Sequence, residues 1–343
     1  FLEGDGDGAK LAEALAACAE ADVGVAVLKV GTSERGARAA AAHTASVAGD
    51  QRIFRALVED AGGAWASDPH ELLELAKALA ERRARPTGRG GLAVLTCSGG
   101  DSGLAADQAE RLGVPLPELS AETRRALTEL LPRAATVANP LDYTAMIWGD
   151  VELLAEIIET VGADPAIGQL LVLYDHPQGL AGDSEASWRR VREGILAGAA
   201  GTEAAVLVAS TLPDLIDDEA TAELAAGGVV GIAGLGEGLA CAPALRAPAG
   251  EAARLREIAA AARAAPPPTA NHGRGATADR HSSGGHGPEA AAAHLEEAEA
   301  KRLLAGSGIS VPRGRVATGA DDAIAAWREL GGPVAVKRVE RGL

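Results

Sequence analysis

The sequence predicts an α/β fold in which parallel β-sheets are covered by helices. Apolar runs of about five residues alternate with longer amphipathic segments, which is the pattern of βαβ units. Turn-forming residues separate these segments, as expected for strands and helices that follow each other closely. The predicted strands are residues 23–30, 91–97, 168–174, 204–210 and 228–234, and helical periodicity is clearest over 10–21, 69–83 and 150–162.

Composition limits the classes of protein to consider. The chain has 343 residues, of which 47% are hydrophobic, so it is long enough for two or three domains with cores of their own. No apolar run reaches the length of a membrane span, and no signal-peptide pattern is present. A net charge of −16 argues against nucleic acid or an anionic membrane as a partner. Because backbone amides act independently of net charge, a local anion site remains possible in such a chain.

Cysteine usage indicates a reduced, cytoplasmic protein. The three cysteines, Cys18, Cys97 and Cys241, are far apart and odd in number. They therefore predict neither a disulfide framework nor a metal site of the CxxC type.

Two breaks in the periodicity divide the chain. Residues 84–91 interrupt the pattern once, and residues 265–287, rich in Pro, Gly, Ser and His, have the composition of a flexible linker. We expect a fragment, because the sequence opens on "FLEG" without methionine and stops just after an apolar run. The predicted segments are a domain over 1–88, a second domain over 89–264, a linker over 265–288 and the start of a third domain over 289–343.

The stretch "AAAHTASVAGD" surrounds His43 with small residues. It lies between the strand that ends near Gly31 and a helix that begins at Asp50, and ligands of such sheets bind beyond the carboxyl ends of the strands. A helix that starts between Ser46 and Asp50 directs free N–H groups at this loop and favours phosphate. A histidine beside a phosphate can be a metal ligand, a general base or a nucleophile. No second His or Cys lies at ligand spacing, so no metal site is predicted.

A second candidate anion site lies in "TCSGGDSGLAADQAERLG", residues 96–113. A strand ends at Cys97, and Gly99 and Gly100 allow close approach of the backbone to an anion before a helix that starts near Asp101. The string "GDSG" lacks the G-x-S-x-G pattern of a nucleophile elbow, so a glycine-rich helix start explains it more simply. Elsewhere, "NPLD" (139–142) predicts a turn, and His70, His176 and His294 are interpreted as ordinary histidines.

Taken together, these segments resemble the ADP-forming acyl-CoA synthetases, relatives of succinyl-CoA synthetase. "KVGTSERGARAAAAHTASVAGD" is similar to the phosphohistidine segment of that family, and the stretch from "LTCSGGDSG" to "ANPLD" is similar to its next domain. "HLEEAEAKRLLAGSGISVPRG" and "GGPVAVK" resemble the opening of its ATP-grasp module. The resemblance implies two flavodoxin-like domains and the start of an ATP-grasp domain.

The resemblance also implies roles for single residues. His43 matches the histidine that is phosphorylated on nitrogen, and Glu3 matches the acidic residue that orients its imidazole. Lys337 matches the ATP-grasp lysine that contacts nucleotide phosphates, whereas Ala42 and Ala45 stand where the family has serine and glycine. The implied phosphate-binding residues lie at two helix starts that would converge on the phosphoryl group: Thr44, Ser46, Gly49, Ser98, Gly99 and Gly100.

The implied reaction converts ATP, a carboxylic acid and CoA reversibly into ADP, phosphate and acyl-CoA, through an acyl phosphate and a phosphohistidine. The expected cofactors are ATP or ADP, coenzyme A and Mg²⁺, with the Mg²⁺ ligands outside this chain, so the fragment alone is expected to be inactive. Assembly into a homo-oligomer stays open. The alternative is a non-catalytic, regulatory relative that senses acyl-CoA, as in the synthetase-like parts of protein acetyltransferases.

Overall fold

The computed structural model describes residues 1–2, 8–33, 35–36, 51–81, 90–264 and 297–331. The chain forms two compact units, Phe1–Ala265 and Pro266–Leu343. The separate domains predicted over 1–88 and 89–264 both fall within the first unit and stay a prediction.

The first unit begins with a small parallel sheet. Strands β1 (Ala26–Leu28) and β2 (Ala64–Ala66) pair in parallel, and Leu2 adds a bridge to Lys29. Four helices accompany this sheet: α1 (Ala9–Glu20), α3 (Gln51–Asp60), α4 (Pro69–Ala80) and α11 (Ala252–Ala264). Phe54 and Val58 of α3 and Leu255 of α11 are buried in one core with the apolar face of α1, because each helix presents its hydrophobic side to the sheet.

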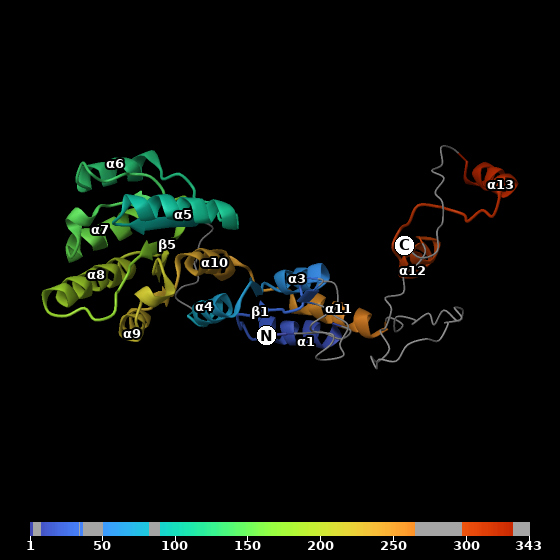
Figure 1. The fold of residues 1–343 in the computed structure, drawn as a ribbon, viewed down its shortest axis with the longest axis horizontal. Helices are drawn as coiled ribbons and strands as arrows, with labels where there is room; N and C mark the ends of the chain where they lie inside the picture. Colours follow the sequence, from blue (N-terminus) through green and yellow to red (C-terminus); the bar gives the residue numbers. More distant parts are fainter. Residues whose placement is uncertain (3–7, 34, 37–50, 82–89, 265–296, 332–343) are drawn as a thin grey trace, which may run out of the picture. The chain divides into compact units, whose positions relative to one another are not determined.

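Helix α11 comes from the far end of the unit in sequence, yet it packs along α1 (Figure 1). Arg256 bonds to Glu20, and Arg263 bonds to Glu13. These ion pairs are exposed and therefore contribute little stability on their own. The buried side chains of Leu255 and Ala259 hold the helix in place instead.

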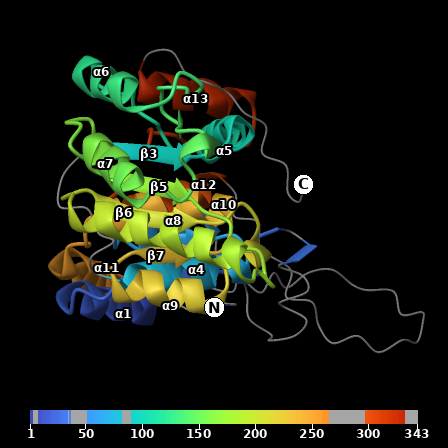
Figure 2. The same cartoon turned by 90° about the vertical axis from the view of Figure 1, so that its left-hand side faces the viewer.

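A five-stranded parallel sheet forms the larger part of the unit. Its spatial order is β4-β3-β5-β6-β7, and Figure 2 shows the labels β3, β5, β6 and β7 in that sequence. In chain order this is 2-1-3-4-5, the order of flavodoxin-like folds. The predicted α/β class is therefore confirmed. The strands are β3 (Gly91–Thr96), β4 (Leu141–Asp142), β5 (Ile167–Leu173), β6 (Ala205–Ala209) and β7 (Val230–Ile232).

Helices cover both faces of this sheet, and each face has its own core. Helices α7 and α8 lie on the side of β5 away from α10 (Figure 1). Every residue of β5 and β6 is buried, as expected for central strands of a doubly covered parallel sheet. The helices are α5 (Gly99–Leu112), α6 (Ala121–Leu130), α7 (Val151–Gly162), α8 (Asp183–Ala200), α9 (Asp218–Ala226) and α10 (Leu235–Arg246), with short 3₁₀ turns η2 (Ala145–Ile147) and η3 (Pro213–Leu215).

Strand β4 was not predicted. Its two residues follow "NP", where the sequence predicts only a turn. The side chain of Asn139 accepts a hydrogen bond from the Val94 N–H at 3.0 Å and donates to the carbonyls of Leu92 and Pro117, both at 2.9 Å. These distant partners hold the segment against β3, so Leu141 and Asp142 pair with its end.

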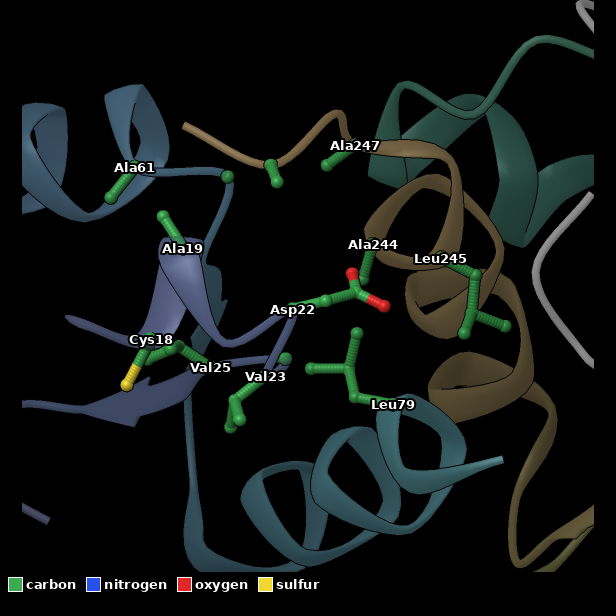
Figure 3. Close-up of a pocket in the computed structure, with 13 residues that line it drawn as sticks. Cys18, Ala19, Asp22, Val23, Val25, Ala61, Leu79, Ala244, Leu245 and Ala247 are labelled. Atoms are coloured by element: carbon green, nitrogen blue, oxygen red, sulfur yellow. The ribbon is translucent and has the colours of Figure 1, made fainter. Parts of the chain in front are cut away.

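A small cavity of about 40 Å³ lies between the end of α1 and the end of α10 (Figure 3). The end of α1, the start of β1 and the end of α10 line it. Asp22 projects into the cavity from a backbone with φ 51°, the left-handed region that few non-glycine residues adopt (Figure 3).

The second unit contributes two described helices, α12 (Glu297–Gly306) and α13 (Ala320–Leu330). Arg315 joins the segment between them to α13 through Asp322 at 2.7 Å and Glu329 at 2.8 Å. No helix in the described ranges is long and apolar enough to cross a membrane.

Candidate functional site

The start of helix α5 lies at the carboxyl edge of the five-stranded sheet. Ser98 caps the helix, since its Oγ accepts a hydrogen bond from the Asp101 N–H at 3.3 Å. Its own N–H donates to Thr96 Oγ1 at 3.2 Å, which fixes the turn out of β3. The next two N–H groups, those of Gly99 and Gly100, form no hydrogen bond with any residue that the structure describes. This helix start can therefore receive an anion.

This position in the sheet is the topological switch point. Strand β3 has β4 on one side and β5 on the other, so the connections after β3 and β5 leave in opposite directions. Ligands of flavodoxin-like folds bind in the crevice that opens there. The predicted residues Ser98, Gly99 and Gly100 therefore lie together where the fold favours a ligand.

Asp142 lies beside the start of α5. It pairs with Thr96 at the end of β4, and its Oδ1 accepts a hydrogen bond from the Thr144 N–H at 2.9 Å. Its Oδ2 lies 3.2 Å from the point where a side chain on Gly99 would begin. A residue larger than glycine at position 99 would therefore press on this carboxylate.

Asp175, the second residue after β5, ties together two loops at this edge. Its carboxylate accepts hydrogen bonds from the Thr211 N–H at 2.6 Å and from Thr211 Oγ1 at 2.7 Å. Its carbonyl accepts a third from Trp188 Nε1 at 2.6 Å. The loop after β5 is thereby fixed both to the loop after β6 and to helix α8.

Cys97 lies half-buried between these carboxylates. Burial raises the pKa of its thiol, and the charges of Asp101, Asp142 and Asp175 raise it further. The thiol is therefore protonated at neutral pH and is a weak nucleophile. Ser102, in the string "GDSG", donates to the Pro140 carbonyl at 3.5 Å from within α5. Neither residue has the setting of a hydrolase nucleophile, which agrees with the interpretation as a helix start.

A buried ionic cluster lies behind the loop after β5. Arg192 of α8 is only 2% exposed, and its guanidinium donates to Tyr174 Oη at 3.0 Å and to Glu223 Oε2 at 2.8 Å. Its third partner is His176 Nδ1 at 2.9 Å. Burial raises the pKa of Tyr174 to about 12, so this hydroxyl stays protonated and available as a hydrogen-bond partner.

The other predicted site residues lie outside the described residues. These are Glu3, His43, Thr44, Ser46, Gly49 and Lys337. Their convergence with the start of α5 therefore stays a prediction. Asp142 and Asp175 were not predicted as part of the site. Asp175 directly follows the predicted strand 168–174 and Asp142 ends the predicted turn 139–142, and neither pattern by itself indicates a ligand site.

A metal site is not formed by the part of the chain that the structure describes, where no group of three His, Cys, Asp or Glu could hold an ion. The His70 side chain is hydrogen-bonded to the backbone, since its Nε2 lies 2.6 Å from the Ala233 carbonyl oxygen. Fold and site together thus define a flavodoxin-like α/β protein whose switch point carries a helix start with unpaired N–H groups among the described residues.

Comparison with known proteins shows which flavodoxin-like proteins this chain resembles. Residues 1–79 match the succinyl-CoA ligase like flavodoxin domain, and residues 288–343 match an ATP-grasp domain. The acetate–CoA ligase (ADP-forming) I of Archaeoglobus fulgidus is 39% identical over 142 residues, 41% of this chain. The acetate–CoA ligase (ADP-forming) II subunit alpha of Pyrococcus furiosus is 35% identical over 151 residues, 44% of this chain.

A solved structure extends the match to most of the chain. The Ca. Korarchaeum cryptofilum dinucleotide-forming acetyl-coenzyme A synthetase 1, in complex with phosphate and ADP, covers 77% of this chain with a TM-score of 0.57 and 25% identity. Over these stretches the chain is similar to the ADP-forming acyl-CoA synthetases. It spans 55% of that solved chain, and the matched stretch makes up 20% of the Archaeoglobus protein and 32% of the Pyrococcus protein.

Proposed function

We propose that this protein is an acid–thiol ligase that converts ATP, a carboxylic acid and CoA reversibly into ADP, phosphate and acyl-CoA, in the cytoplasm. The observation that carries the proposal is the start of α5 at the switch point, where the N–H groups of Gly99 and Gly100 face the crevice without a partner among the described residues. Backbone donors fixed in this way stabilise phosphoryl charge without needing to reorganise. The relatives named as acetate–CoA ligases support the reaction class.

In the direction of ATP synthesis, the first step forms an acyl phosphate. An oxygen of inorganic phosphate attacks the acyl carbon of acyl-CoA, the C–S bond breaks, and CoA leaves as a thiol that takes up the proton from phosphate. The start of α5 binds the phosphate oxygens during this step. Ser98 keeps the helix start in place through its two hydrogen bonds.

The second and third steps pass the phosphoryl group through His43. The neutral imidazole attacks phosphorus, the P–O bond breaks, and the acid leaves as a carboxylate. Glu3 accepts a hydrogen bond from the far ring nitrogen, fixes the tautomer and supports the cationic phosphoimidazole. A terminal oxygen of ADP then attacks phosphorus, the P–N bond breaks and ATP forms, with Lys337 binding the nucleotide phosphates.

Mg²⁺ belongs to the proposal only as a companion of the nucleotide. No described group of residues fits it, so none of these steps is assigned to a metal ion held there.

The test is covalent labelling of the full-length protein with acyl-CoA, Mg²⁺ and radioactive phosphate. One phosphoryl group per active site is expected, labile to acid and stable to base, as a phosphoramidate is. His43→Ala should abolish the label, and Glu3→Gln should slow its formation by about 10²–10⁴-fold because acid–base support is lost. An acid-stable label, or a label that survives His43→Ala, would disprove the mechanism.

A regulatory protein that senses acyl-CoA is the second candidate. Ala42 and Ala45 favour it, since the family's serine and glycine at these places leave a hydroxyl and more space near the phosphoryl group. This candidate predicts that the protein binds acyl-CoA and acquires no label.

A further inference from the structure

Arg192 is a charged residue at the centre of the core that supports the crevice. Its guanidinium reaches Tyr174 and His176 on one side and Glu223 of α9 on the other, at 2.8 to 3.0 Å. The Arg192 side chain is 2% exposed, whereas that of its ion-pair partner Glu223 is 39% exposed. A buried charge of this kind adds little stability compared with well-packed apolar side chains. Its presence here therefore calls for an explanation beyond stability.

The contacts of Arg192 fix the residues on either side of Asp175. Because a guanidinium has only donors, His176 Nδ1 must accept. His176 is therefore the neutral tautomer with its proton on Nε2, which lies 3.7 Å from Asp217 Oδ2. Arg192 thus holds the side chains of both neighbours of Asp175, which fixes the backbone at that residue. The Asp175 carboxylate is hydrogen-bonded to Thr211.

Asp175 follows β5 at the same carboxyl edge of the sheet as the start of α5, which follows the neighbouring parallel strand β3. Its charge acts on the thiol of Cys97, directly before the cap residue Ser98. Asp142 of β4 acts on the same thiol from the other side. Because β4 and β5 lie on either side of β3, the two carboxylates lie at the carboxyl ends of the strands that flank the start of α5. Arg192 fixes the residues next to one of them.

We propose that Arg192 is a positioning residue for the phosphate step. By holding Tyr174 and His176 it keeps the Asp175 carboxylate turned to Thr211 and away from the phosphate that binds at the start of α5. If the loop loosens, this negative charge is free to approach the phosphate oxygens and repel them. The inference rests on the proposed function and adds a residue to its phosphate site.

The experiment compares the two ways of forming phosphohistidine in the full-length protein. One uses acyl-CoA with radioactive phosphate and requires free phosphate to bind at the start of α5, and the other uses ATP labelled on its terminal phosphate and requires no free phosphate there. Arg192→Met removes all donors while keeping much of the side-chain volume. It should raise the KM for phosphate on the order of 10- to 100-fold, the cost expected of a small misplacement at the site, and change labelling from ATP by no more than about twofold.

Three further variants sharpen the comparison. Arg192→Lys keeps a charge and some donors, so it should fall between the wild type and Arg192→Met. Thr211→Val removes one hydrogen bond to Asp175 and should give the same pattern to a smaller degree. Arg189→Met is the control, since it removes an exposed ion pair to Glu185 from the same helix and should leave both reactions unchanged.

The outcomes separate this inference from the proposed function. An unchanged KM for phosphate in Arg192→Met, or an equal loss of both labelling reactions in proportion to unfolded protein, overturns the positioning role. If Arg192→Met does not fold, Arg192→Lys and Thr211→Val decide by the same criterion. A wild type that takes no label from either donor refutes the proposed function, and the inference with it.

Discussion

Asp142 and Gly99 meet across the crevice so closely that the carboxylate Oδ2 lies 3.2 Å from where a Cβ of residue 99 would stand. The Thr144 N–H holds the other oxygen of this carboxylate at 2.9 Å, so Asp142 cannot turn aside without losing that bond. Glycine at position 99 therefore keeps the start of α5 open and Asp142 in place at the same time.

The first prediction is that Gly99→Ala and Gly103→Ala differ, although both residues lie in α5. A methyl group on Gly103 meets nothing within 4 Å, so Gly103→Ala should stabilise the protein by up to about 1 kcal/mol through helix propensity. Gly99→Ala should gain less stability and raise the KM for phosphate, because its methyl group displaces Asp142. Urea denaturation and labelling kinetics measure both effects. Identical results for the two variants would contradict the close approach.

The second prediction concerns two buried tyrosines, Tyr143 and Tyr174, which are 2% and 1% exposed. The Tyr174 hydroxyl bonds to Arg192, whereas the Tyr143 hydroxyl has no partner among the described residues. Tyr174→Phe should destabilise the protein by about 1–3 kcal/mol, because it leaves a donor of Arg192 unsatisfied. Tyr143→Phe should leave stability unchanged or raise it by about 1 kcal/mol. Equal losses in urea denaturation would mean that the Tyr143 hydroxyl is bonded.

The third prediction is a dependence of stability on pH through Asp164. Its carboxylate accepts hydrogen bonds from the Ser120 N–H at 2.7 Å and from the Ala166 N–H at 2.9 Å. Burial by itself raises the pKa of Asp164, but the hydrogen bonds outweigh burial and hold the pKa below its ordinary value of 3.8. The unfolded chain therefore binds a proton first as the pH falls, and the carboxylate stabilises the folded state at higher pH.

Asp164→Asn should accordingly lower the free energy of unfolding by about 1–3 kcal/mol at pH 7. The difference from the wild type should persist down to about pH 3.8 and shrink as the pH falls further through the lowered pKa of the folded state. Urea denaturation at several pH values measures it. A difference that stays constant down to pH 2 would show that the charge of Asp164 does not matter.

The fourth prediction separates the two candidate functions. If Ala42 and Ala45 close the site, the wild type binds acyl-CoA but takes no label at His43. The double change Ala42→Ser and Ala45→Gly should then restore an acid-labile label, because it returns a hydroxyl and removes a methyl group. If the wild type itself takes the label, the protein is an enzyme. If the double variant takes no label, Ala42 and Ala45 are not the cause of the inactivity.

The start of α5 could be predicted because its signals are local. Gly91–Thr96 is an apolar run, and the Ser and Gly residues that follow it both end the strand and start the helix. The predicted start near Asp101 was two residues late, because Gly99 and Gly100 already belong to the helix that Ser98 caps.

The residues that flank the start of α5 could not be predicted, because their partners are distant in sequence. Asn139 holds β4 through contacts that span 22 to 47 residues, and Asp175 binds Thr211 36 residues away. His176 resembles any ordinary histidine in sequence, since its partner Arg192 follows 16 residues later on another element. Pairings of this kind depend on tertiary structure. The alternation of apolar and polar residues reports only local structure, so it does not indicate them.

The packing of α11 on α1 bears on how this protein can be divided. The polypeptide leaves the small sheet after α4, builds the whole five-stranded sheet, and comes back to bury Leu255 and Ala259 beside Leu15 and Ala16. The large sheet is thus an insertion within the small one, anchored at both of its ends. A recombinant piece that stops at residue 88 would leave α1 without its cover and expose an apolar surface to solvent. A protease cut within residues 82–89 should instead yield two polypeptides that stay associated and elute together on gel filtration.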